Sequence, residues 1–325
     1  MKKMQDKQSC SISHKKKRPA TSSFRKDWMK YKYLFILLIP GLIYFLLFCY
    51  VPMGGTVIAF ENYKINKGIL GSEWVGFEHF RKFFSSKQFW PVIRNTFLLN
   101  FYTLIWGFPL PIIFAVMLSE VKNEKFRKAI QTMSFMPYFI SMVIAVGLVN
   151  MLATTNGGVI NNILELLGHK KIDFLVEPKW FRTVYVVTSI WKNFGWNSVI
   201  YLAAIIGIDQ GLYEAAELDG ASKIQRIMHV TIPMIMPTVV VMLILNIGNL
   251  MTSSFDLAYL LQQPLNQEVS EVISTFVYKR GIAASGTFPQ YSYATAVGLF
   301  QSVINIALLF IANKTSKKIT GNGLY

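Results

Sequence analysis

Charged side chains are missing from five long, mostly apolar stretches of the chain. These stretches run Tyr33–Phe60, Asn95–Ser119, Ala129–Leu164, Val230–Phe255 and Gly281–Asn313. Each is longer than the roughly 20 apolar residues that a helix needs to cross a bilayer. The pattern therefore predicts an all-α, polytopic membrane protein.

Six transmembrane helices account for this pattern. We place them at Tyr33–Met53, Asn95–Leu118, Ile130–Leu152, Thr183–Ile206, Pro237–Leu257 and Tyr291–Ala312. The fourth helix contains one charged residue, Lys192. A cation inside a span either faces protein or water, or extends its stem toward a helix end, and the sequence supports both interpretations of Lys192 equally.

The distribution of Lys and Arg predicts that both termini are cytoplasmic. In this orientation the cytoplasmic segments hold 20 of these residues and the longer external loops hold 12, in the sense of the positive-inside rule. We expect a basic cytoplasmic tail over residues 1–32, a six-span domain over 33–312 with a cytoplasmic loop at 207–236, and a cytoplasmic tail over 313–325. The basic cluster His14–Arg18 either binds anionic lipid or is a disordered tail that sets topology.

The external loop Gly157–Trp180 carries apolar residues at helical spacing between Val159 and Leu167. This spacing predicts a short helix. Such a helix either lies at the outer membrane face or simply packs on its neighbours.

The chemistry that is missing narrows the function. A net charge of +16 alone would suggest nucleic acid, but only 15% of the residues are charged and the basic ones lie in tails and loops. No Gly-Lys-Ser/Thr triplet, His-Glu-x-x-His or Cys-x-x-Cys occurs, which argues against a nucleotide, metal or redox site on this chain. Acidic residues are absent from the middle of every predicted span, which argues against coupling to protons or sodium. Energy for uphill transport would come from another chain.

The loop between the fourth and fifth predicted spans, Ile208–Pro233, has the features of two short helices. Asp209 and Ser222 are good N-cap residues for the first and second helix. Gly220 supplies the positive φ that ends a helix, and Pro233 is expected to stop the second helix before the membrane.

This loop resembles the Glu-Ala-Ala loop of ATP-binding-cassette importer permeases. Glu214-Ala215-Ala216 is followed after three residues by Gly220, and Pro233 ends the pattern after Val230 and Ile232. These last two stand where the family has Ile and Leu.

Five further segments resemble one branch of that family, the lipoprotein-linked poly- and oligosaccharide permeases within the carbohydrate permeases of the maltose-type class. They are Pro40–Tyr44, Pro52-Met53, Ile58–Phe60, Gly68–Gly76 and Ser316–Leu324.

This resemblance implies a set of partners in a bacterial cytoplasmic membrane. They are a second homologous permease, two cytoplasmic ATPases that bind ATP and Mg, and an extracytoplasmic solute-binding protein. The chain itself would be no enzyme and would bind no cofactor. The residues expected to couple it to an ATPase are Tyr213, Glu214, Ala215, Ala216, Asp219, Gly220 and Pro233.

Uncharged polar and aromatic residues in the spans are candidates for the substrate path. They are Asn193, Trp196, Asn197 and Tyr201 on one face of the fourth span, Asn246, Asn249 and Ser253 on one face of the fifth, and Gln301 and Asn305 on the sixth. Amides bond hydroxyls in both directions, so the set suits a carbohydrate. The alternative is that these residues hydrogen-bond one helix to another.

Other functions fit less well. A glycerol phosphodiester would favour cations in the path, where only Lys192 stands; a peptide is also open. A membrane enzyme would need a paired acid and base or a metal site, and a scaffold would not explain the Glu-Ala-Ala loop.

Overall fold

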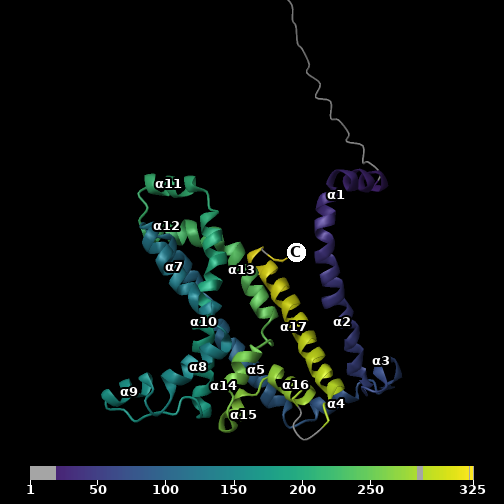
Figure 1. Cartoon of the computed structure of the whole chain (residues 1–325). Coiled ribbons are helices and arrows are strands. Elements are labelled where there is room, and N and C mark those ends of the chain that lie inside the picture. Colours follow the sequence, from purple (N-terminus) through teal and green to yellow (C-terminus); the bar gives the residue numbers. More distant parts are fainter. Residues whose placement is uncertain (1–19, 284–287, 322, 325) are drawn as a thin grey trace, which may run out of the picture. The chain divides into compact units, whose positions relative to one another are not determined.

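The computed structural model describes residues 20–283, 288–321 and 323–324, so the basic cluster His14–Arg18 lies outside the described residues. The chain forms two compact units, Met1–Thr56 (unit 1) and Val57–Tyr325 (unit 2), and is mostly helical (Figure 1).

Unit 1 contains the first predicted span. Its elements are α1 (Ala20–Phe45), the π-helical turn η1 (Leu46–Tyr50) and α2 (Val51–Gly54). The helical run Tyr31–Phe60 is long and apolar enough to cross a membrane, and it includes the predicted Tyr33–Met53.

Unit 2 begins with short elements and continues with long helices. After η2 (Gly55–Phe60), which joins the two units, its elements are β1 (Glu61–Asn62), α3 (Gly68–Gly71), β2 (Glu73–Trp74), α4 (Glu78–Phe84), α5 (Phe89–Gly107), α6 (Pro109–Ser119), α7 (Glu124–Phe139), α8 (Met142–Ala153), α9 (Val159–Leu166), α10 (Pro178–Ile206), α11 (Gln210–Leu218), α12 (Lys223–Arg226), η3 (Ile227–Thr231), α13 (Ile232–Gly248), α14 (Phe255–Leu261), η4 (Pro264–Asn266), α15 (Gln267–Ser270), α16 (Ile273–Gly281) and α17 (Tyr291–Thr320). The two strands pair antiparallel, with Glu61 opposite Trp74.

Four helical runs in the described residues are long and apolar enough to span a membrane, or up to six if two bent helix pairs count as one span each. The four runs are Tyr31–Phe60, Phe89–Ser119, Lys223–Gly248 and Tyr291–Thr320. The bent pairs are α7 with α8, at 100°, and α10 with α11, at 68°.

The third predicted span, Ile130–Leu152, is wrong as one continuous helix. Pro137 lies inside α7 and cannot donate to the helix ladder. Ser141 then caps α8, since its hydroxyl accepts from the N–H of Ile144 at 3.3 Å. The chain therefore turns by 100° between α7 and α8.

The fifth predicted span, Pro237–Leu257, is misplaced, and Pro233 does not stop a helix. The π turn η3 widens the helix just before Pro233, where the proline ring would otherwise clash with a carbonyl one turn earlier. The helical run therefore continues from α12 into α13 and ends at Gly248, and residues 249–254 form a non-helical break before α14.

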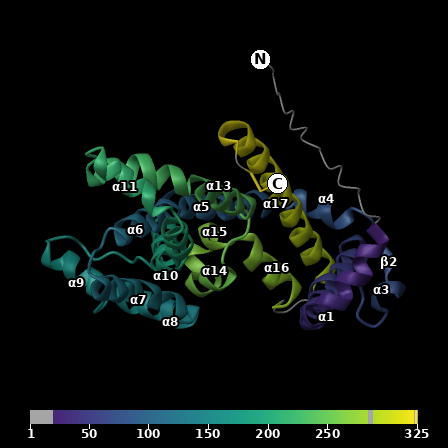
Figure 2. The same cartoon turned by 90° about the horizontal axis from the view of Figure 1, so that it is seen from above.

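Helix α10 contacts most of the long helices of unit 2, including α5, α6, α7 and α13, and the view from above shows it among them (Figure 2). It contributes Phe181 and Tyr185 to one buried apolar cluster and Tyr201 and Ile205 to another. It therefore joins the packing at both ends of the unit.

The predicted short external helix is present as α9. Its Asn161 is fully buried, and its amide bonds the carbonyls of Ala153 and Ile172. Leu166 and Leu167 are 85% and 68% exposed. The helix is thus both packed on its neighbours and apolar on its outer side.

Candidate functional site

The segment after α10 forms the predicted pair of short helices. Asp209 caps α11 by accepting from the N–H of Gly211 at 3.0 Å. Gly220 has a φ of +77°, a conformation in which a Cβ is strained. Ser222 caps α12 in a capping box with Gln225. The predicted caps and the predicted break at Asp219-Gly220 are confirmed.

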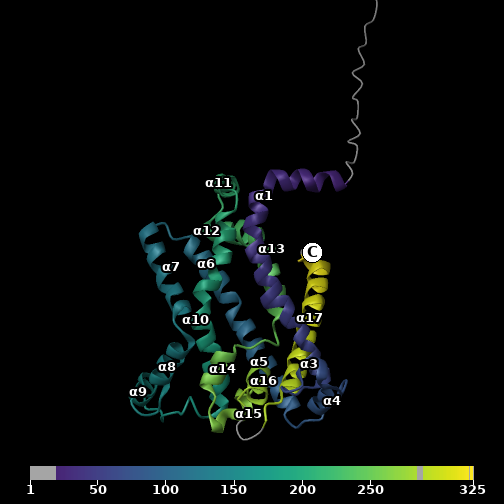
Figure 3. The same cartoon turned by 45° about the vertical axis from the view of Figure 1, so that its right-hand side comes forward.

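Helix α11 projects from unit 2 with no buried residue. Leu218 on it is 90% exposed. Two contacts hold it against the next segment: the hydroxyl of Tyr213 lies 2.9 Å from that of Thr231, and Glu217 pairs with Arg226 at 3.2 Å. These contacts fix α11 and the turn at Gly220, which we call the stub, and leave its apolar and acidic outer surface exposed. In Figures 1 and 3 it stands at the end of unit 2 opposite to α9, α15 and α16.

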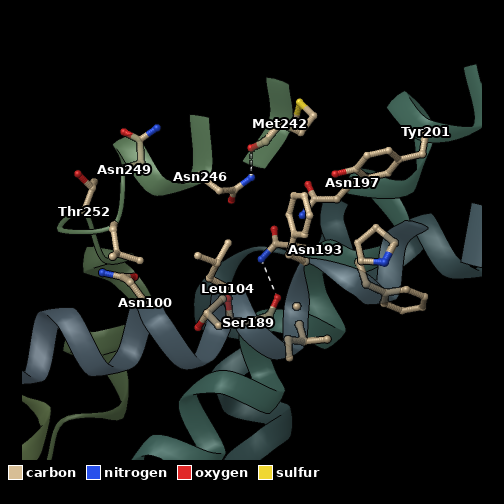
Figure 4. A pocket seen from close by; sticks show the side chains of 17 residues that line it. Asn100, Leu104, Ser189, Asn193, Asn197, Tyr201, Met242, Asn246, Asn249 and Thr252 are labelled. Atoms are coloured by element: carbon tan, nitrogen blue, oxygen red, sulfur yellow. Dashed lines mark hydrogen bonds between the residues drawn. The ribbon is translucent and has the colours of Figure 1, made fainter. Parts of the chain in front are cut away.

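A cavity of about 330 Å³ lies between α5, α10 and α13 (Figure 4). Polar but uncharged side chains make up much of its lining. They are Asn100, Thr103, Ser189, Asn193, Asn197, Tyr201, Asn246, Asn249 and Thr252.

The asparagines of this cavity present acceptors to it. The amide nitrogens of Asn193 and Asn246 donate to the carbonyls of Ser189 and Met242, each at 2.8 Å (Figure 4). Asn100 makes the same bond, four residues back along its own helix, at 2.9 Å. These bonds leave each side-chain oxygen and a second N–H available to a solute.

Five of the nine predicted path residues line this cavity: Asn193, Asn197, Tyr201, Asn246 and Asn249. The four residues predicted to share one face of the fourth span do not all line the cavity. Trp196 instead stacks on Tyr138 of α7, at 4.7 Å between ring centroids. The same holds for the three residues predicted to share one face of the fifth span. Ser253 follows the end of α13, is buried and lies 3.4 Å from the hydroxyl of Ser274.

Gln301 and Asn305 on α17 hold the chain break after α13. The amide of Gln301 donates to the carbonyl of Met251 at 2.8 Å. Asn305 accepts from the N–H of Met251 at 3.1 Å and donates to the hydroxyl of Thr252 at 2.7 Å. Gln301 and Asn305 thus connect α17 to the break after α13, in agreement with the alternative that polar residues of the spans hold neighbouring segments together.

Sequence reasoning missed four polar lining residues: Asn100, Thr103, Ser189 and Thr252. All four lie within predicted spans, so the criterion that selected the other amides also covers Asn100. The hydroxyl residues carry no comparable signal, because Ser and Thr often bond their own helix.

Lys192 faces protein, which decides between its two interpretations. Its side chain is buried, and its ammonium donates to the carbonyls of Pro137, at 3.2 Å, and Tyr138, at 3.0 Å, and to that of Ile140. These carbonyls lie in the last turn of α7 and at its C-cap, where the regular helical donors end; that of Pro137 also accepts from the N–H of Ile140 at 3.3 Å. Lys192 does not line the cavity.

The lining of the cavity suits an uncharged, hydroxyl-rich solute. No cluster of three His, Cys, Asp or Glu side chains able to hold a metal is found in the described part of the chain. Amide and hydroxyl groups on three helices can exchange hydrogen bonds with sugar hydroxyls, while Tyr201 supplies an aromatic edge.

The sequence matches the family of binding-protein-dependent transport system inner membrane components over residues 92–321. It is 44% identical over 294 residues to the polygalacturonan/rhamnogalacturonan transport system permease protein YteP of Bacillus subtilis, with 90% of each chain covered. It is 43% identical to protein LplB of Bacillus subtilis, with 90% of this chain and 91% of LplB covered.

Two solved structures are similar over nearly the whole fold. One is a bacterial ABC transporter involved in the import of the acidic polysaccharide alginate. It has a TM-score of 0.81 and 39% identity, over 92% of this chain and 99% of that chain. The other is a bacterial alginate ABC transporter in complex with an alginate pentasaccharide-bound periplasmic protein. It has the same TM-score of 0.81 and the same identity of 39%, over 94% of this chain and 99% of that chain.

Proposed function

Because the chain belongs to the family of binding-protein-dependent transport system inner membrane components, we propose that it is one of two permease subunits of an ATP-driven oligosaccharide importer. Members of this family are membrane proteins and not themselves enzymes, so ATP hydrolysis belongs to separate subunits. The saccharide cargo is supported by the polysaccharides named for its relatives.

One observation carries the proposal: a single helix connects the cavity to the stub. Helix α10 lines the cavity with Asn193, Asn197 and Tyr201, and after a bend of 68° the chain enters α11. A displacement of α11 is therefore transmitted along α10 to the residues that would contact the solute.

In the proposed assembly, six spans cross the bacterial cytoplasmic membrane with both termini inside. The basic tail covers 1–32, the permease domain 33–312 and the C-terminal tail 313–325. The loop 207–236 is cytoplasmic, and its stub seats in a cleft of an ATPase through Tyr213, Glu214, Ala215, Ala216, Asp219 and Gly220. Pro233 keeps the following helix aligned.

The transport cycle follows from two states with different affinities. ATP binding draws two ATPases together, the two stubs approach each other, and the permeases rock from inward- to outward-facing. ATP can drive this change only because the ATPases bind it differently in the two states. An extracytoplasmic binding protein delivers the oligosaccharide to the outward-facing cavity.

Affinity purification of the tagged chain from gently solubilised membranes tests this assembly. Mass spectrometry should identify a second permease, an ATPase and a solute-binding protein. Glu214→Lys, on the exposed stub, should lose the ATPase and keep the second permease. Glu124→Lys, an exposed carboxylate on α7, is the matched control and should keep both. Recovery of the wild-type chain without any ATPase would refute the proposal.

A further inference from the structure

A second cavity of unit 2, the outer pocket, lies at the end opposite to α11. Three segments form it: the residues after β1, helix α4, and the start of α17. Figure 1 shows α3, α4 and the first turn of α17 together at that end. Its volume of about 880 Å³ is in the range of small-molecule binding sites.

Contacts between these segments give the pocket fixed walls. The N–H of Tyr63 donates to the hydroxyl of Ser292 at 2.9 Å, which ties the segment after β1 to α17. The ring of His79 on α4 lies 3.1 Å from the carbonyl oxygen of Glu61 on β1. Tyr63 and Tyr291 meet edge to face at 6.1 Å. The pocket is thus built by contacts distant in sequence.

Two lysines without carboxylate partners face this space. Lys64 and Lys82 line the pocket beside His79, and none of the described residues that line it is Asp or Glu. No described carboxylate lies within ion-pair distance of Lys64 or Lys82. The ammonium of Lys82 instead stands over the ring of Tyr293, 5.5 Å from its centroid, which orients the charge without neutralising it.

Three other lysines of unit 2 do pair with a carboxylate. Lys171 pairs with Glu165 at 3.2 Å, Lys179 with Glu177 at 2.8 Å, and Lys279 with Glu271 at 3.4 Å. Glu61 directly precedes the lining residue Asn62 in the chain, but its side chain is buried and does not line the outer pocket.

We propose that the outer pocket is a subsite for a carboxylate-bearing sugar residue of the incoming oligosaccharide. Lys64 and Lys82 bind the carboxylate with charge-assisted hydrogen bonds, and the rings of Tyr63 and Tyr291 contact the sugar face. The proposal rests on the proposed function and deepens it. The polar lining of the cavity between α5, α10 and α13 consists of uncharged amides and hydroxyls. The charge of the oligosaccharide is therefore recognised at the outer pocket.

The test compares an acidic probe with a neutralised one. The whole transporter is purified, and binding of tetragalacturonate and of its methyl ester is measured by calorimetry without the binding protein. The double variant Lys64→Gln/Lys82→Gln should bind tetragalacturonate about 10-fold more weakly and the ester unchanged. Lys67→Gln, an exposed lysine outside the pocket, is the matched control and should bind both normally. Raised salt should weaken only the acidic probe.

Three results would overturn the subsite: no binding of tetragalacturonate by the wild type, an equal loss for probe and ester, or no change in the double variant. If the lysines instead contact the binding protein, the double variant raises the concentration of binding protein needed for transport and leaves calorimetric binding intact, which also overturns it. ATP-driven uptake by the wild type is measured in parallel. Failure of uptake with intact, lysine-dependent binding would count against the proposed function and not against the pocket.

Discussion

The two helix breaks of unit 2, between α7 and α8 and between α13 and α14, are stabilised by different chemistry. At the first, the ammonium of Lys192 donates hydrogen bonds to three carbonyls at the end of α7. At the second, the neutral amides of Gln301 and Asn305 bond the backbone of Met251 and the hydroxyl of Thr252. Backbone groups freed within a membrane need such partners.

The position of the cavity explains the difference. Asn249 and Thr252 of the second break line the cavity, whereas no residue of the first break does. The charged side chain of Lys192 therefore extends from α10 toward α7 and away from the cavity, and the neutral partners lie beside the cavity. The comparison indicates that the fold keeps fixed charge out of the cavity between α5, α10 and α13.

Lys192→Met should have the largest effect on stability. The substitution keeps the approximate length of the side chain but removes a donor from three carbonyls, of which that of Pro137 keeps the N–H of Ile140 at 3.3 Å. The expected cost is about 3 kcal/mol in the free energy of unfolding. Thermal unfolding in detergent measures it. Lys179→Met, whose side chain is 69% exposed, should leave the melting temperature nearly unchanged. Equal melting temperatures for the two variants would show that Lys192 does not hold the first break.

Gly195→Ala should be the next most destabilising change. A Cβ at Gly195 would overlap the backbone carbonyl of Ser134 on α7, so α7 and α10 must separate, at a cost of about 2 kcal/mol. Gly298→Ala on α17 is the matched control, because a Cβ there meets nothing within 4 Å. The pair is compared by thermal unfolding, and similar stabilities would contradict the close packing of α7 on α10.

Asn305→Leu should be milder for stability, at about 1–2 kcal/mol, and should alter transport more than folding. Its loss frees the N–H of Met251 and leaves the hydroxyl of Thr252 with only the longer bond from Gln301 at 3.4 Å, so the loop beside the cavity loosens. Ser302→Ala, one turn away on α17 and exposed, is the control. Uptake assays and unfolding are measured together; an unfolding loss as large as that of Lys192→Met would contradict the contrast between the breaks.

Asn197→Asp should change stability least and test the uncharged cavity directly. The substitution is isosteric and places a carboxylate in the cavity, where desolvation and repulsion of an acidic solute should slow uptake about 10-fold. Asn162→Asp on the exposed side of α9 should transport normally. Unchanged uptake by Asn197→Asp would mean that the cavity tolerates fixed charge.

The sequence predicted features that depend on neighbouring residues. Charge-free stretches locate the membrane-crossing runs, because a charge is costly in the apolar centre of a bilayer. The caps Asp209 and Ser222 and the turn at Gly220 act within a few residues, so local pattern is sufficient for them.

The breaks could not be predicted in the same way. Lys192 bonds carbonyls 52 to 55 residues away, and Asn305 bonds groups 53 and 54 residues away. An apolar run thus does not reveal where a distant polar side chain will interrupt it. The same reason limits the substrate path, since Trp196 is drawn to Tyr138 of α7 and Gln301 to Met251.

ATP-driven uptake by the purified transporter in proteoliposomes tests the central claim, that the stub after α10 couples ATP hydrolysis to passage of an oligosaccharide. The wild type should accumulate labelled tetragalacturonate only with ATP and the binding protein. Gly220→Val introduces a branched side chain at a φ of +77° and adds bulk to the stub. It should still insert and keep the second permease, with the strain confined to the exposed stub, yet lose nearly all uptake. Normal uptake by this variant, or accumulation by the wild type without ATP, would contradict the account.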